Sequence, residues 1–160
     1  MTRLAKQAHE GTLNILVGGE VDLLEVALPV LKTFTENIDH VGALGFGHRM
    51  KLLHNYVSIC HFTVLAEAAA NAAQMEVEPQ VFLDVLTKGS GQEISLERLR
   101  NCMLSGDTND VPFTIRKAIK DMNYYRDMVG DDKGSIIVAD SISNAIGSSF
   151  GSGHEDAYLP

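Results

Sequence analysis

One long stretch without a helix breaker limits what this chain can fold into. Residues 50–75 contain no glycine or proline and are rich in leucine, alanine and valine. The pattern predicts a single helix of about 25 to 30 residues, well above the usual length of about 11 to 12. Apolar residues occur on almost all of its faces, so we expect this helix to lie at the centre of its domain or of a dimer.

The chain after this stretch is also helical in pattern. Turn-forming segments rich in Gly, Ser and Asp divide it. The shorter helices that we predict cover residues 79–87, 94–104, 113–129 and 139–150. The predicted fold class is therefore mainly α, built around one long central helix.

The segment before the long helix has a different pattern. Residues 12–17 and 38–41 are typical of short strands, and residues 20–34 have apolar side chains at helical spacing. The order strand, helix, strand is typical of an α/β domain. Because two short strands do not form a stable sheet alone, we interpret this segment as the closing unit of an α/β domain whose beginning is absent.

Composition and charge exclude several classes of function. The net charge of −8 argues against binding to nucleic acid, which normally requires a basic surface. No segment has the length and apolar character of a membrane span, and the first residues lack the apolar core of a signal peptide. The two cysteines, Cys60 and Cys102, fall within helical patterns. We therefore expect a cytoplasmic protein without a disulfide framework and without a membrane partner.

A polar stripe at the start of the long helix is the candidate site. Lys51, Asn55 and Ser58 are spaced at i, i+4 and i+7, which places them on one helical face. Burying such groups without partners costs about 1–3 kcal/mol each, so the stripe needs either solvent or a bound ligand. Two interpretations stay open: a ligand site, or a solvated first turn with an exposed lysine.

Two glycines precede this stripe and resemble part of a nucleotide-binding motif. Gly45 and Gly47 open the helix, and Glu67 follows at about the distance of 20 residues that a dinucleotide fingerprint requires. However, Arg49 and Met50 occupy the region where a small third residue is needed, and Glu67 lies inside the long helix. We therefore interpret the glycines as a tight turn into the helix.

The histidines and cysteines of the long helix give weaker signals. His48, His54 and His61 do not have the spacing of metal ligands, so we expect no metal. Cys60 and His61 are adjacent. Adjacent helical residues point about 100° apart, so these two do not form a nucleophile pair.

A series of motifs in a fixed order resembles one known enzyme family. The motifs are Gly11-Thr-Leu-Asn-Ile-Leu-Val-Gly-Gly19, Pro29-Val-Leu, His40-Val-Gly, Gly45-x-Gly47-x-x-x-Lys51-x-x-x-Asn55, Ala66-Glu-Ala-Ala, and Pro112-Phe113 with Lys120-Asp121. Together they resemble the C-terminal portion of the 3-hydroxyisobutyrate dehydrogenase, or β-hydroxyacid dehydrogenase, family. The resemblance covers nearly the whole chain, and the linked motifs are far more specific than any one of them.

The resemblance implies a function and roles for several residues. The family consists of NAD(P)-dependent oxidoreductases that interconvert a small 3-hydroxy acid and its aldehyde acid. By resemblance, Lys51 is the acid/base residue at the substrate hydroxyl, Asn55 holds the substrate, and Lys120 and Phe113 lie beside the cofactor, NAD or NADP. The implied fold is an all-helical C-terminal domain of the 6-phosphogluconate-dehydrogenase-like type, which commonly pairs into homodimers or larger oligomers.

The substrate pocket departs from the usual family pattern. The family usually has Ser-Gly-Gly before the first strand, where it binds the substrate carboxylate, whereas this chain has Thr2-Arg3-Leu4. An arginine there, and the motif Asn55-Tyr-x-Ser58, resemble the sulfolactaldehyde reductase branch. Because guanidinium groups bind carboxylate or sulfonate with two N–H groups, we expect Thr2, Arg3 and Ser58 to bind a substrate with a second anionic group. His54 replaces a frequent second asparagine of the family.

The resemblance also predicts the domain organisation. Residues 1–43 are expected to be the closing strand–helix–strand unit of a truncated dinucleotide-binding domain. Residues 44–160 are expected to be the helical domain for substrate binding and dimerisation, itself truncated at its end. The enzyme hypothesis then concerns a parent protein, and the isolated chain is expected to be inactive. The alternative is a non-catalytic helical dimerisation module left by truncation.

Overall fold

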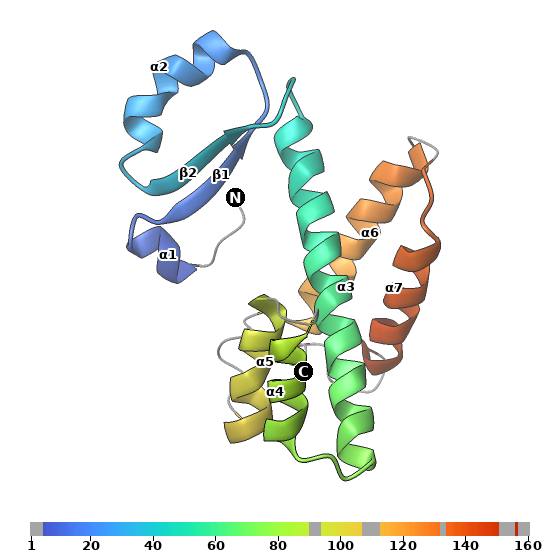
Figure 1. The fold of residues 1–160 in the computed structure, drawn as a ribbon. Coiled ribbons are helices and arrows are strands. Elements are labelled where there is room, and N and C mark those ends of the chain that lie inside the picture. The colour runs from blue at the N-terminus through green and yellow to red at the C-terminus, as the bar shows by residue number, and fades with distance from the viewer. Residues whose placement is uncertain (1–4, 90–93, 107–112, 132–133, 151–155, 157–160) are drawn as a thin grey trace. The chain divides into compact units, whose positions relative to one another are not determined.

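The structure is a computed structural model that describes residues 5–89, 94–106, 113–131, 134–150 and 156. The chain divides into two compact units, Met1–Asn55 and Tyr56–Pro160. The division falls within one continuous helix, α3 (Phe46–Gln74), which Figure 1 shows in cyan to green. The domain boundary predicted from the sequence, between residues 43 and 44, stays a prediction.

The first unit has the predicted strand–helix–strand order. Its elements before α3 are α1 (Ala5–His9), β1 (Leu13–Val17), α2 (Val21–Leu31) and β2 (Thr35–His40). The two strands pair in parallel, with Leu13 opposite Thr35 and Ile15 opposite Ile38. Parallel strands need a crossover connection, and α2 provides it.

Two details of this unit differ from the sequence prediction. The short helix α1 was not predicted, and β2 begins at Thr35 instead of residue 38. The side chains of Glu36 and Asn37 are exposed, so the start of β2 has no apolar alternation that could identify it as a strand. Pairing with β1 extends the strand, and the Asn37 amide donates a hydrogen bond of 2.9 Å to Asn14 Oδ1 across the pair.

The end of β1 packs directly against the start of α3. A Cβ atom added to Gly18 would lie 2.5 Å from the Ala43 carbonyl oxygen and 2.7 Å from the Gly47 nitrogen. A Cβ atom added to Gly47 would lie 2.7 Å from the Leu16 carbonyl oxygen. Gly45 adopts a φ of 91°, which favours glycine, at the turn before the helix. The glycines therefore have a steric role in the turn and in this backbone contact.

The long helix α3 has the predicted length, with 29 residues. Its buried side chains are Ile59, Phe62, Ala69 and Ala72. On the opposite side, large apolar side chains remain exposed within one copy of the chain: Met50, Leu53, Val57, Val64 and Met75. The predicted fold class, mainly α around one long helix, is confirmed. Whether the exposed face lies at the centre of a dimer, as the sequence analysis allowed, stays a prediction, because the apolar pattern does not distinguish an internal core from an external face.

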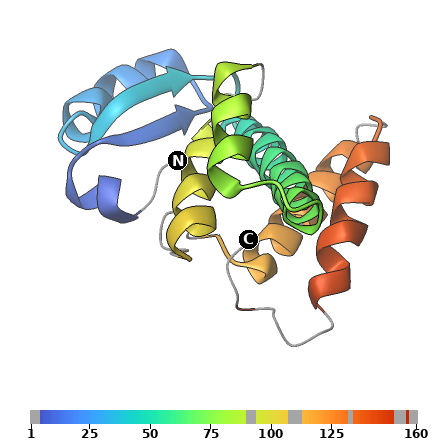
Figure 2. The same ribbon diagram turned by 60° about the horizontal axis from the view of Figure 1, so that its bottom comes forward.

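The second unit is a helical bundle that packs along the second half of α3. Its further helices are α4 (Pro79–Lys88), α5 (Ile94–Ser105), α6 (Ile115–Asp131) and α7 (Ile137–Phe150), as Figure 2 shows. Each was predicted, with ends that differ by two residues or fewer. Its core combines α3 residues with buried side chains such as Leu99 and Met122. Within the described part of the chain, no helix combines the length and apolar character needed to cross a membrane.

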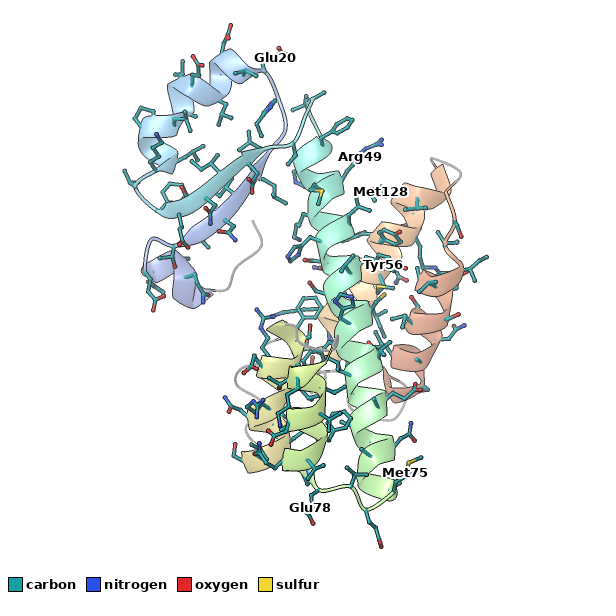
Figure 3. The ribbon with its side chains drawn as sticks, in the orientation of Figure 1. Glu20, Arg49, Tyr56, Met75, Glu78 and Met128 are labelled. Atoms are coloured by element: carbon teal, nitrogen blue, oxygen red, sulfur yellow. The ribbon has the colours of Figure 1, made fainter. Side chains whose placement is uncertain are left out.

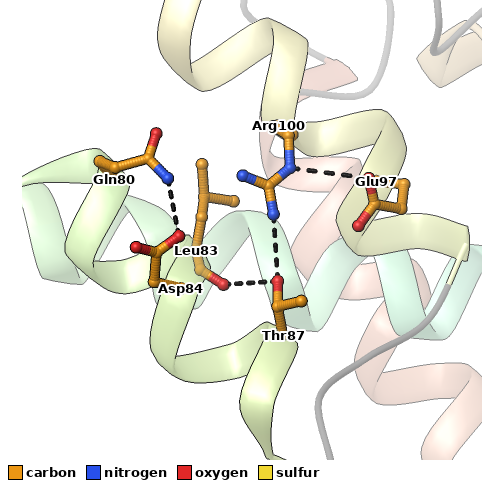
Figure 4. Close-up of polar contacts among 6 residues, drawn as sticks. All are labelled: Gln80, Leu83, Asp84, Thr87, Glu97 and Arg100. Atoms are coloured by element: carbon orange, nitrogen blue, oxygen red, sulfur yellow. Dashed lines mark hydrogen bonds and ion pairs between the residues drawn. The ribbon is translucent and has the colours of Figure 1, made fainter.

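A polar contact fixes α5 against α4. Arg100 Nη2 donates to Thr87 Oγ1 over 3.0 Å, and Thr87 Oγ1 donates to the Leu83 carbonyl oxygen over 2.7 Å (Figure 4). The Arg100 Nε atom also lies 3.6 Å from Glu97 Oε2 on its own helix. Because the guanidinium has several donors in a fixed plane, one side chain holds two helices in register.

We predict that Gly47→Ala destabilises the chain by about 1–3 kcal/mol, the usual cost of overpacking. The new methyl group would collide with the Leu16 carbonyl oxygen. Gly147→Ala in α7 is the control, because no described atom lies within 4 Å of its added Cβ. Alanine there should be neutral or stabilising, since glycine weakens a helix interior. Equal unfolding free energies for the two variants in urea titrations would contradict the packing role.

Candidate functional site

The first turns of α3 carry the polar side chains that the sequence singled out. Lys51 and Asn55 lie one turn apart in the first unit, and both are half-buried. Lys51 has no hydrogen-bond or ion-pair partner within the part of the chain that the structure describes. A lysine ammonium group without a protein partner has the capacity to bind an anionic or hydroxyl oxygen of a ligand.

The direction of this polar stripe is set by the rotation of the helix. Asn55, Phe62 and Ala69 follow one another at seven-residue intervals, and seven residues turn a helix to within about 20° of two full turns. Phe62 and Ala69 are buried. The helical face that carries Asn55 in the first half of α3 is therefore the inward face in the second half.

The amide of Asn55 has a contact with its neighbour in the sequence. His54 Nδ1 lies 3.2 Å from Asn55 Oδ1. The His54 side chain is exposed, whereas Asn55 is half-buried. The sequence drew attention to His54 only because it replaces a frequent asparagine, and nothing in the sequence predicted this contact.

A second group of polar residues lies on α6, in the second unit. Lys120 Nζ lies 3.2 Å from Asp121 Oδ1, and the Asp121 side chain is only 5% exposed. Lys120 Nζ is also 5.9 Å from the centre of the Tyr124 ring, where a cation is attracted to the aromatic face. Phe113, just before α6, packs partly buried against the core. The buried carboxylate thus holds an exposed ammonium group at the surface of α6.

An aromatic stack joins α3 to α6 next to these groups. The rings of Tyr56 and Tyr125 are parallel within 5°, with centroids 4.2 Å apart (Figure 3 labels Tyr56). Tyr125 is buried, so the contact forms part of the core of the second unit. Tyr56 directly follows Asn55, and Tyr125 lies one turn after Asp121. Sequence analysis did not identify this pair, because contacts between distant segments leave no local signal.

Burial also changes the acidity of two groups near this stack. It raises the pKa of the Tyr56 phenol above its ordinary value of 10.0, with further contributions from Cys60 and Tyr125. Burial raises the pKa of the Cys60 thiol above 9.0, and the hydrogen bond with Tyr56 opposes this change. Cys60 is therefore less ionised than a solvent-exposed thiol, which argues against a nucleophilic role.

The predicted site residues are distributed over both units. Lys51 and Asn55 belong to the first unit; Ser58, Phe113 and Lys120 belong to the second. Thr2 and Arg3 lie outside the described residues. The roles assigned to all of these residues stay predictions. Over the described ranges, no group of three or more His, Cys, Asp or Glu side chains is arranged to hold a metal ion.

Comparison with known proteins gives one family match. The model for "NAD-binding of NADP-dependent 3-hydroxyisobutyrate dehydrogenase" matches residues 45–156. The chain is 32% identical over 127 residues to the 3-sulfolactaldehyde reductase of Escherichia coli, which is 79% of this chain and 42% of that protein. It is 32% identical over 103 residues to the 2-(hydroxymethyl)glutarate dehydrogenase of Eubacterium barkeri, 64% of this chain and 34% of that protein.

A solved structure has the same fold. The 3-hydroxyisobutyrate dehydrogenase of Mycobacterium tuberculosis with L-serine superimposes with a TM-score of 0.83 at 26% identity, over 96% of this chain and 55% of that one. The chain spans 41%, 48% and 34% of the length of three curated relatives that it matches. It therefore corresponds to less than half of these proteins.

We predict that the raised pKa of Tyr56 makes the folded chain sensitive to alkali. The unfolded phenol ionises at lower pH than the folded one, so its contribution to stability is complete below about pH 9 and falls as the pH rises through 10. Tyr56→Phe keeps the ring stack and removes the ionising group. Unfolding free energies measured across this pH range should therefore decline less steeply for Tyr56→Phe than for the parent chain.

Tyr124→Phe is the matched control for this experiment, because Tyr124 is exposed on α6. Its stability should decline with pH as steeply as that of the parent chain. If Tyr56→Phe and Tyr124→Phe gave the same pH dependence, the burial assigned to the Tyr56 phenol would be contradicted.

Proposed function

The chain belongs to the 3-hydroxyisobutyrate dehydrogenase family of NAD(P)-dependent hydroxyacid dehydrogenases, and from this premise we propose that it supplies the substrate-binding helical part of such an enzyme. The reaction that we propose is the interconversion of a small 3-hydroxy acid and its aldehyde acid. The observation that carries the proposal is the polar stripe of α3, where Lys51 and Asn55 lie one turn apart and half-buried.

Lys51 has the chemistry that the proton transfer requires. Oxidation of an alcohol by hydride removal also releases the hydroxyl proton, and reduction of the aldehyde consumes one. The neutral Lys51 amine accepts this proton during oxidation, and the ammonium form returns it during reduction. The Asn55 amide holds the substrate oxygen in reach of Lys51. The half-buried position favours this role, since excluding water strengthens both contacts.

We assign the cofactor contacts of this chain to Phe113 and Lys120. The cofactor, NAD or NADP, supplies hydride transfer when bound. An exposed ammonium group suits the phosphates of a dinucleotide, and the buried Asp121 carboxylate 3.2 Å away keeps that group in one position. A partly buried phenylalanine suits contact with an aromatic ring. These two kinds of side chain suit the NAD(P) cofactor of the family.

We propose that the substrate carries a second anionic group. One of the named relatives acts, by name, on such a compound, because (hydroxymethyl)glutarate carries two carboxylates. Another acts, by name, on sulfolactaldehyde, whose anionic group is a sulfonate. In this chain, Arg3, Thr2 and Ser58 are the residues that we assign to this group. Arginine offers paired N–H donors, and the two hydroxyls add further donors.

We further propose that a second copy of the chain covers the outer face of α3. Val57 and Val64 are 48% and 60% exposed, and Met50 and Leu53 continue the same apolar face toward the helix start. A continuous apolar face of this length favours association in water. A non-catalytic dimerisation module would need this face alone. The effect of a Lys51 substitution on kcat therefore discriminates between the two functions.

We expect Lys51→Ala to lower kcat by at least about 100-fold, the usual contribution of a general acid or base. The measurement is hydride transfer, followed by NAD(P)H absorbance, in the full-length dehydrogenase. Lys117→Ala is the control, since Lys117 is an exposed lysine of α6. Cofactor affinity should stay the same in both variants. A Lys51→Ala enzyme with nearly unchanged kcat would sink the acid/base assignment.

The proposed dimer gives a separate prediction. The chain should sediment as a dimer or larger species, and the double substitution Val57→Lys with Val64→Lys should dissociate it, because two charges from each copy would be buried in the contact. Val26→Lys on α2 is the control, because Val26 is 78% exposed but lies far along the chain from α3. A parent chain that sediments as a monomer would contradict the proposed pairing.

A further inference from the structure

The contact between His54 and Asn55 determines which end of the Asn55 amide faces the histidine. The two interacting atoms are His54 Nδ1 and Asn55 Oδ1, 3.2 Å apart. An amide oxygen only accepts hydrogen bonds, so the ring nitrogen in this pair carries the proton and donates it. The structure thus pairs one tautomer of His54 with one orientation of the Asn55 amide.

The orientation of this amide decides what it offers to a ligand. An asparagine amide has an accepting end and a donating end, which point in different directions. With its oxygen held by His54, the Asn55 side chain turns its N–H group away from the ring. A flipped amide would direct the oxygen there instead. A carboxylate, sulfonate or hydroxyl oxygen of a substrate needs the donor, because two acceptors repel each other.

We infer that His54 is a positioning residue: its ring N–H fixes the Asn55 amide so that the amide donates to an oxygen of the hydroxy-acid substrate. This inference rests on the proposed function and deepens it. It assigns a role to the position where the chain departs from the asparagine that is frequent in the family. It also separates two tasks on adjacent residues: Asn55 binds the substrate, and His54 holds Asn55.

The test compares two replacements of His54 in the full-length enzyme. His54→Asn keeps an N–H donor near the position of the ring Nδ1, whereas His54→Leu removes it. We expect His54→Leu to raise the KM for the hydroxy acid about tenfold, with a much smaller change in kcat, because one oriented hydrogen bond is lost. His54→Asn should restore the KM to within about threefold of the parent value by the same reasoning.

A matched control removes another histidine from the same helix. His48 is exposed in the first turn of α3 and lies seven residues before Asn55. His48→Leu should therefore leave the KM unchanged. If the KM rose equally in His48→Leu and His54→Leu, the effect would come from leucine on this surface, and the inference would be overturned. A rise of equal size in His54→Asn and His54→Leu would also overturn it.

A spectroscopic measurement on the chain itself provides a second readout. Nitrogen-15 NMR of the neutral His54 ring should show the proton on Nδ1, and His54→Leu should shift the Asn55 side-chain amide resonances. A neutral ring protonated on Nε2 alone would overturn the inference without any assay of activity. If the enzyme is active and its KM is unaffected by His54→Leu, the inference is overturned but the proposed function stands. If the enzyme turns over no hydroxy acid, the proposed function and the inference are both overturned.

Discussion

The close backbone contact between β1 and α3 fixes the position from which the polar stripe of α3 extends. A Cβ atom on Gly47 would lie 2.7 Å from the Leu16 carbonyl oxygen, and one on Gly18 would lie 2.7 Å from the Gly47 nitrogen. Because a helix is regular, the position and rotation of its first turn set those of Lys51 and Asn55 in the next two turns. The glycines therefore contribute to the candidate site through the geometry of the helix start.

We assign different tasks to the two faces of α3. One face is polar at Lys51 and Asn55 and apolar farther along, where Phe62 and Ala69 are buried. The outward face is apolar and exposed, and we assign it to a second copy of the chain. The stack of Tyr56 on Tyr125 joins this helix to α6, which carries Lys120 and its buried partner carboxylate. In the proposed function, this helix carries residues for substrate binding and for association, and it packs on the helix to which we assign the cofactor contacts.

Much of the fold was predictable because apolar side chains that face a core recur along the sequence with the period of a helix. That period identified α3 and the helices after it, but it did not reveal that the α3 face around Val57 is exposed within one copy. The start of β2 at Thr35 was missed because its pairing involves the backbone and exposed polar side chains. The candidate site was predicted from the motif residues. Sequence spacing could not predict the ring stack or the His54–Asn55 contact, because both depend on side-chain conformation and tertiary packing.

The most direct test of the central claim is a segment exchange. The chain would replace the segment that it matches in the Escherichia coli 3-sulfolactaldehyde reductase, which is 42% of that protein. Hydride transfer would then be measured by NAD(P)H absorbance with a panel of 3-hydroxy acids and their aldehyde acids. We expect turnover of at least one compound, because in the proposed function the chain supplies the substrate-binding residues. A chimera that folds and binds NAD(P) but turns over none of them would contradict the proposed function.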